Sequence, residues 1–145
     1  MTERYLFRGK RLDNGEWVQG YYVRFPMPIS VGAESSIHYI YTTAKDPDDN
    51  CNRYEVDPAT VGQCTGLRDK NGTLIFEGDI VRYKISTKLT VIAAVKWNGA
   101  SAEFNAFVLN RDGDYIDDDE WRLCETSVNL EIIGNIHNNP ELLCE

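Results

Sequence analysis

The residues with the greatest catalytic potential are two histidines and four cysteines: His38, His137, Cys51, Cys64, Cys124 and Cys144. A nucleophile needs a base within hydrogen-bonding reach, and none of these residues stands in a recognisable catalytic signature. No cysteine pair has C-x-x-C spacing and no histidine lies close to a cysteine, so a zinc site built from scattered ligands is the weaker interpretation. There is no nucleophile elbow, P-loop or dinucleotide-binding glycine pattern. The sequence therefore predicts neither an enzyme nor a cofactor.

Acidic residues offer two candidate cation sites. Asp46, Asp48 and Asp49 lack the order of calcium ligands in an EF-hand and indicate a solvated loop. The cluster from Asp112 to Glu120 is the better candidate for Ca²⁺ or Mg²⁺, because carboxylates suit hard cations. Consecutive acids on a strand point in different directions, however, so a solvated acidic segment is favoured and cation binding stays open.

The formal net charge is -8 and the sequence pI is about 4.8. This surplus opposes non-specific binding to nucleic acids and anionic membranes. The dense basic patch is Arg4, Arg8, Lys10 and Arg11, which indicates a solvated strand face rather than a nucleic-acid arm. The first residues lack the apolar run of an export signal and no segment approaches a membrane span. We therefore expect a cytoplasmic protein with reduced thiols.

Several polar and aromatic residues are candidates for a binding surface. The polar run Gln63, Thr65 and Arg68, with Asp79, could form a surface site, although the same residues could simply satisfy turns. Trp17 and Trp97 are expected to fill a core. Trp121, which follows the acidic cluster, is the more plausible interface residue.

Local signals place the elements that would carry these residues. Asp13-Asn14-Gly15 and Asp69-Lys70-Asn71-Gly72 predict tight hairpin turns, and Gly78-Asp79 predicts a bend before a strand. Asp57-Pro58 and Asn139-Pro140 predict short helices with a capping residue and Pro at the first helical position.

The longer pattern predicts antiparallel strands. Residues 5–23 predict an aromatic-rich hairpin whose Trp17, Gln19 and Tyr21 side faces a core, and residues 37–43 predict a strand. Two prolines in residues 24–36 predict a loop or irregular edge. No helical periodicity is long enough for a crossover helix. We therefore predict a mainly β fold of antiparallel hairpins forming a small barrel, with one or two short helices. It would be a single domain over 1–145, with possible subregions 1–55 and 56–145.

Three segments carry a family resemblance: FRGKRLDNGEWVQG, VDPATVGQCTGLRDKNGTLIFEGDIV and IIGNIHNNPELL. With them the chain resembles the YopX family of phage and prophage proteins. The resemblance implies an SH3-like barrel, coding by a bacteriophage or prophage, action in the cytoplasm of a bacterial host, and assembly into oligomers. It brings no catalytic residues.

Two functions from different classes fit these observations. The first is a non-enzymatic protein-binding or assembly module that engages a host or phage protein, because SH3-like barrels bind through loops and strand edges. The alternative is a nucleic-acid-associated accessory protein using the Arg4–Arg11 patch, which the net charge disfavours. We also expect a homo-oligomer, because aromatic-rich sheets with exposed edges pair between subunits.

Overall fold

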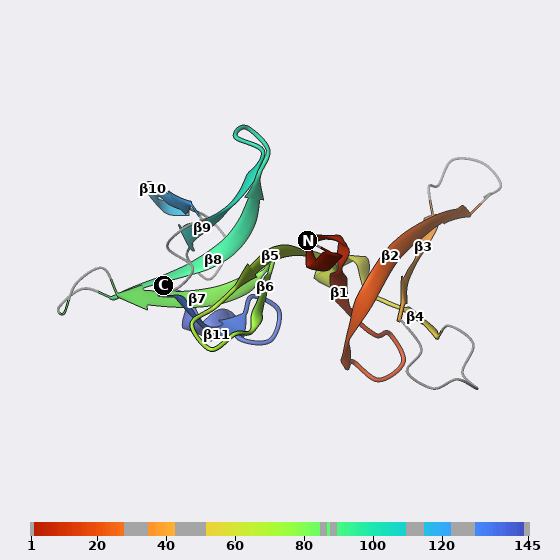
Figure 1. The fold of residues 1–145 in the computed structure, drawn as a ribbon. Coiled ribbons are helices and arrows are strands. Elements are labelled where there is room, and N and C mark those ends of the chain that lie inside the picture. The colour runs from red at the N-terminus through yellow and green to blue at the C-terminus, as the bar shows by residue number, and fades with distance from the viewer. Residues whose placement is uncertain are drawn as a thin grey trace. The chain divides into compact units, whose positions relative to one another are not determined.

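The computed structural model describes residues 2–27, 35–42, 52–84, 87, 90–109, 115–122 and 130–143. In these ranges the chain is mainly β, as predicted, and its helices are short 3-10 turns (Figure 1). The chain forms two compact units, an N-terminal unit (Thr2–Gln63) and a C-terminal unit that begins at Cys64. No helix in the described ranges is long and apolar enough to cross a bilayer.

The N-terminal unit is an antiparallel sheet in the order β4-β3-β2-β1. Its strands are β1 (Phe7–Lys10), β2 (Trp17–Met27), β3 (Ser35–Tyr41) and β4 (Arg53–Glu55), with 3-10 turns η1 (Thr2–Tyr5) and η2 (Pro58–Thr60). The first residues of β5 (Gly62–Arg68) pair with β1, and β5 then carries the chain into the C-terminal unit.

Local chemistry in this unit follows the predictions at two turns. The β1–β2 hairpin turns at residues 13–15, where Gly15 has a φ of 72° and the Asn14 side chain accepts a hydrogen bond from the Glu16 N–H. Asp57 caps η2 by accepting from the Ala59 N–H at 3.0 Å. Both signals depend on near neighbours in the sequence, which explains why they could be found there.

The predicted loop or irregular edge over residues 24–36 is wrong at both ends, because β2 continues through Met27 and β3 begins at Ser35, with Pro26 opposite Ser36. Proline cannot donate to a ladder and is therefore tolerated where a strand has an open edge. Within β2, the residues that pair with β1 are Trp17–Gly20, so the part of β2 around Pro26 has β3 as its described partner strand.

The predicted burial of the Trp17, Gln19 and Tyr21 side is also wrong. Gln19 and Tyr21 are exposed and Trp17 is half-buried. The core of the unit lies on the opposite face, where Ile40 and Val56 are buried beside Gly9. An aromatic strand pattern shows that two faces differ but does not show which of them other elements will cover.

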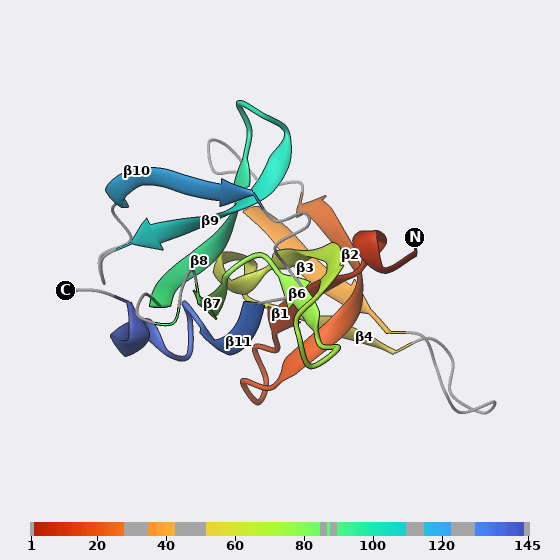
Figure 2. The same cartoon turned by 60° about the vertical axis from the view of Figure 1, so that its left-hand side comes forward.

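The C-terminal unit contains a five-stranded antiparallel sheet in the order β10-β9-β8-β7-β11 (Figure 2). These strands are β7 (Asp79–Lys84), β8 (Thr90–Asn98), β9 (Glu103–Leu109), β10 (Tyr115–Arg122) and β11 (Leu130–Asn135). β5 pairs with β6 (Leu74–Phe76), and the 3-10 turn η4 (Pro140–Leu142) follows β11. The Asn139-Pro140 signal correctly predicts this turn, but the Asn139 side chain makes no capping bond.

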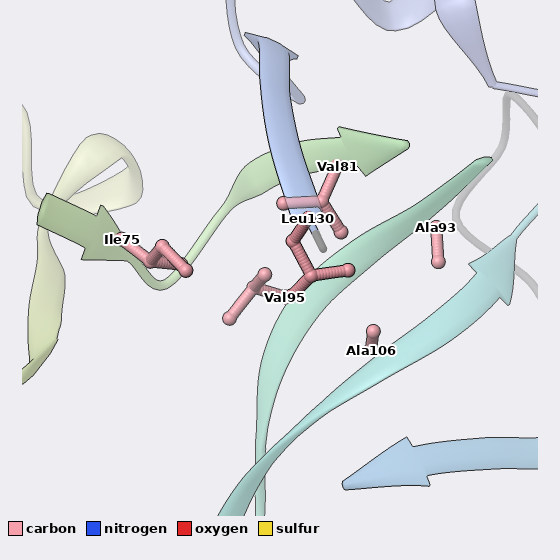
Figure 3. Close-up of a cluster of buried hydrophobic side chains, with 6 residues drawn as sticks. All are labelled: Ile75, Val81, Ala93, Val95, Ala106 and Leu130. Atoms are coloured by element: carbon pink, nitrogen blue, oxygen red, sulfur yellow. The ribbon is translucent and has the colours of Figure 1, made fainter. Parts of the chain in front are cut away.

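Two hydrophobic clusters fill this unit, as the alternation of side chains across the strands requires. The first joins β6, β7, β8, β9 and β11 through Ile75, Val81, Ala93, Val95, Ala106 and Leu130 (Figure 3). The second contains Ile80, Ala94, Phe107 and Leu143. Phe104 packs against the first cluster and Phe107 lies in the second, so these two residues of the same strand contribute to different clusters.

Two turns position the strands of this unit. Asp69 Oδ1 accepts from the N–H groups of Asn71 and Thr73, and Gly72 has a φ of 81°. Gly78, with a φ of 91°, forms the bend that leads into β7. The pairing of the described strands does not by itself establish a closed barrel, so the SH3-like barrel stays a prediction, as does single-domain behaviour over 1–145.

Candidate binding surface

The predicted polar site is built from residues that make hydrogen bonds within the chain. Thr65 is buried, donating from Oγ1 to the Ile75 carbonyl and accepting from the Leu67 N–H. Asp79 is 2% exposed and accepts from the Phe76 N–H at 2.7 Å. Arg68 donates to the Gly72 carbonyl and Gln63 donates to the Arg4 carbonyl. The bonds of Arg68 and Asp79 are local to turns, as the turn-satisfying alternative expects, whereas Gln63 reaches a residue far away in the sequence. Ligand binding by these residues stays a prediction.

Other sequence candidates lie partly outside what the structure describes. Trp121 belongs to β10 opposite Ala106, but its side chain is not among the described groups. The same holds for the side chains of the Asp112–Glu120 cluster. Among the described residues, no group of three or more His, Cys, Asp and Glu side chains could hold a metal ion.

The two tryptophans expected in the core differ in their surroundings. Trp97 is 49% exposed, so its prediction is wrong, and it makes an edge contact with Phe104 at a centroid distance of 5.0 Å. It lies near the end of β8, beside the turn into β9. Trp17 is half-buried beneath two cations, with the Arg8 guanidinium carbon 4.9 Å and Lys10 Nζ 5.6 Å from its ring centroid.

The basic patch of the sequence is divided by the sheet. Arg8 and Lys10 pair with Gln19 and Trp17 and share their face. Arg11 lies over the Tyr54 ring and forms an ion pair with Asp13 at 2.5 Å. That hydrogen-bonded pairing raises the pKa of Arg11 and lowers the pKa of Asp13. Arg11 therefore does not share one surface with Arg8 and Lys10.

A larger surface lies on the same side of the N-terminal sheet as Arg8 and Lys10. Residues directly opposite in an antiparallel ladder share a face, and Tyr21 lies opposite Tyr41, Val23 opposite Tyr39 and Tyr41 opposite Arg53. We name this surface the aromatic face. Its side chains are Arg8, Lys10, Trp17, Gln19, Tyr21, Val23, Phe25, Met27, Ile37, Tyr39, Tyr41, Arg53 and Glu55.

Ring contacts connect the centre of the aromatic face. Phe25 meets Tyr39 edge-on at 5.8 Å, and Tyr39 meets Tyr41 at 6.4 Å. Arg53 lies over the Tyr39 ring at 4.9 Å, and a hydrogen bond with Tyr41 raises the pKa of this arginine. Such contacts hold the aromatic side chains in place while leaving part of each in solvent.

Three apolar residues of β2 on the aromatic face are exposed, whereas Trp17 and Val23 are half-buried. Tyr21, Phe25 and Met27 are 47%, 42% and 45% exposed. A large exposed apolar patch with Tyr, Trp, Met and Arg marks an interaction site more often than scattered single residues do. Phe25 and Met27 could not be recognised as strand residues from the two prolines beside them, which predict a loop or irregular edge. The period-two series Tyr21, Val23, Phe25 and Met27 was the signal that could have revealed them.

The opposite side of the sheet holds a polar pair. The Tyr22 hydroxyl is hydrogen-bonded to His38 Nδ1, and the two rings stack at 5.7 Å. Burial raises the pKa of Tyr22, with Arg24 acting in the other direction. The hydroxyl therefore stays protonated near neutral pH. This contact gives His38 a structural partner within the sheet.

Comparisons with known proteins give a family but no activity. A family model described as YopX protein matches residues 6–144. The chain is similar to the crystal structure of protein EF1440 from Enterococcus faecalis, with 22% identity, a TM-score of 0.45, and coverage of 94% of this chain and 96% of that chain. No curated protein matches.

Proposed function

We propose that this chain, which belongs to the YopX family, is a non-enzymatic module that binds another protein through the aromatic face. The observation that supports the proposal is the exposure of Tyr21, Phe25 and Met27 on one side of β2. Burial of apolar surface drives association, and well-packed aromatic anchors dominate the binding energy of interfaces. Coding by a phage or prophage, action in the bacterial cytoplasm and self-assembly belong to the same proposal.

The test is an affinity purification of the tagged protein from bacterial lysate with nuclease. The test variant carries Tyr21→Ser, Phe25→Ser and Met27→Ser. The control variant carries Tyr5→Ser, Leu12→Ser and Trp97→Ser, which remove exposed large apolar side chains outside the aromatic face. We expect a discrete protein partner that the test variant loses and the control keeps. Equal recovery by both variants would contradict the placement of the site.

One observation favours the alternative role in nucleic-acid binding. Arg8 and Lys10 lie on the aromatic face beside Trp17, and sheets that bind single strands combine cations with aromatic rings. The net charge of -8 opposes it. Binding to oligothymidylate that falls steeply with salt and is lost in Arg8→Ala/Lys10→Ala would favour this role over the first.

A further inference from the structure

β2 is paired unequally along its length. β1 lies opposite Trp17–Gly20, whereas β3 lies opposite Tyr21–Met27. The second half of β2 therefore has one edge that no described strand occupies. Figure 1 shows β2 and β3 continuing together past the end of β1. We name the edge of Tyr21–Met27 that faces away from β3 the open edge.

The open edge is long and regular. Its register with β3 runs without a break from Tyr21 opposite Tyr41 to Met27 opposite Ser35. By contrast, the strand at the other side of this sheet, β4, has 3 residues. Proteins commonly blunt sheet edges with short strands or bulges, because unpaired backbone groups are a template for another chain. Between Tyr21 and Phe25 the open edge is neither short nor bulged, and the edge protection that it does carry consists of a charged residue, Arg24, and a proline, Pro26.

Pro26 indicates which backbone groups face the open edge. Proline has no N–H and is accommodated where its nitrogen faces away from the partner strand. In an antiparallel strand the N–H and C=O of one residue point to the same side, and the side alternates along the chain. Because Pro26 faces away from β3, Tyr22 and Arg24 also direct their N–H and C=O groups to the open edge.

The side chains beside this edge define the chemistry of a matching segment. Tyr21, Val23 and Phe25 present apolar surface on the aromatic face. On the opposite face Arg24 is exposed, donates from Nε to Ser36 Oγ at 2.9 Å, and forms no ion pair with a described carboxylate. A strand added at the open edge would place apolar side chains on the aromatic face and, at the alternate positions, side chains that contact the guanidinium of Arg24 on the opposite face.

We propose that the open edge of β2 receives an extended segment of a partner protein as an added strand, with apolar side chains at alternate positions and a carboxylate beside Arg24. This inference rests on the proposed binding function and names its mode. Strand addition gains affinity from main-chain hydrogen bonds and specificity from alternate side chains. An acidic segment complements Arg24, whereas a second copy would bring another Arg24 close to the first. A nucleic acid would leave the ladder groups of Tyr22 and Arg24 unmatched.

The experiment selects binders for the whole chain from a displayed library of random peptides and measures their affinity for two variants. Arg24→Pro removes one N–H from the open edge, at a position with the same orientation as Pro26. Arg24→Ala removes the charge and keeps the N–H. We expect alternating apolar and acidic peptides whose affinity falls about tenfold or more in Arg24→Pro and about threefold in Arg24→Ala.

A second measurement keeps the proposal testable if Arg24→Pro does not fold by circular dichroism. Hydrogen exchange at the Tyr22 and Arg24 amides should slow when a selected peptide binds the wild-type chain, and Phe25→Ser should weaken binding without changing this pattern. Peptides that need Phe25 but leave the two amides unprotected would overturn strand addition and preserve the binding function. Selection of no peptide that needs Phe25 would count against both.

Two further outcomes would assign the open edge to an occupant other than a segment of a partner protein. Self-association in sedimentation, abolished by Arg24→Pro but not by Arg24→Ala, would assign the open edge to a second copy. Salt-sensitive binding of oligothymidylate that displaces the peptides would assign the surface to a single-stranded nucleic acid. Either result would overturn the proposal of a partner segment.

Discussion

Asp69 is a carboxylate, 6% exposed, that fastens a turn to a neighbouring strand. Its Oδ1 accepts from Asn71 and Thr73, and its Oδ2 accepts from the Ile132 N–H at 3.1 Å. Burial raises the pKa of Asp69, but the hydrogen bonds from Ile132, Thr73 and Asn71 outweigh it, so the pKa lies below 3.8. Three backbone donors therefore depend on one ionised side chain.

The first prediction concerns Asp69→Ala. Loss of this acceptor leaves backbone N–H groups poorly satisfied. We therefore expect the free energy of unfolding, measured in urea at neutral pH, to fall by about 2–4 kcal/mol. Because the folded-state pKa of Asp69 is lowered, the stability that its carboxylate contributes is fully present above pH 3.8. This stability is lost as the pH falls through the lower pKa of the folded state. The gap between wild type and variant should narrow in acid. A constant gap would contradict this role, and Glu141→Gln serves as an exposed control.

The second prediction concerns Asn105, a fully buried side chain of β9. Its Oδ1 and Nδ2 have no hydrogen-bond partner among the described groups. Burying an unsatisfied amide costs free energy, and valine suits a strand. We expect Asn105→Val to raise the free energy of unfolding by about 1–2 kcal/mol. A clear decrease in the free energy of unfolding of this variant, measured in urea, would show that the Asn105 amide has a partner such as buried water.

At the scale of the elements, the approach of β2 to β3 depends on one residue. A Cβ built at Gly20 would lie 2.2 Å from the Tyr41 carbonyl oxygen, which is backbone and cannot rotate away. A Cβ at Gly99 would meet only Trp97 Nε1, at 4.0 Å. The spacing of these two strands, and with it the aromatic face, therefore requires glycine at position 20.

The third prediction compares two glycine substitutions. We expect Gly20→Ala to destabilise the N-terminal unit by about 2–4 kcal/mol, because the backbone must shift. Gly99→Ala should change stability by less than about 0.5 kcal/mol. Urea unfolding followed by amide exchange in β2 and β3 would check both values. Equal effects of the two substitutions would argue against a close strand approach.

Turns and element types could be predicted from the sequence to a greater extent than burial. Gly15 and Gly72 adopt positive φ in turns whose Asn and Asp residues bond to nearby backbone, so the information is local. The exposure of Tyr21 and Trp97 depends on which face distant segments cover. The aromatic face could not be predicted for a related reason. Pro26 indicated a loop, whereas a strand with an open edge tolerates proline.

At the scale of the whole molecule, the two units differ in how much they bury. The C-terminal unit has two clusters, and Ala93, Ala94 and Val95 of β8 are each 0% exposed. The core of the N-terminal unit is smaller, with Ile40 and Val56 as its fully buried apolar side chains among the described residues. β8 is also paired on both sides, with β7 and β9.

The fourth prediction is therefore a gradient in native-state amide exchange. Hydrogen-bonded amides of β8 should be the slowest, since their exposure requires opening of both neighbours and both clusters. Amides of Tyr22 and Arg24 should exchange fast in the free protein. Slow exchange at these two positions, measured without a ligand, would show that the open edge is already covered.

The position of Leu142 and Leu143 also bears on biosynthesis. Leu143 belongs to the second cluster and Leu142 packs against it, and both follow every strand of its sheet in the sequence. On a translating ribosome, Ile80, Ala94 and Phe107 would emerge well before the residues that cover them. Exposed apolar surface on an incomplete chain invites aggregation. The interval before Leu143 leaves the exit tunnel is therefore when the nascent C-terminal unit would most need a chaperone.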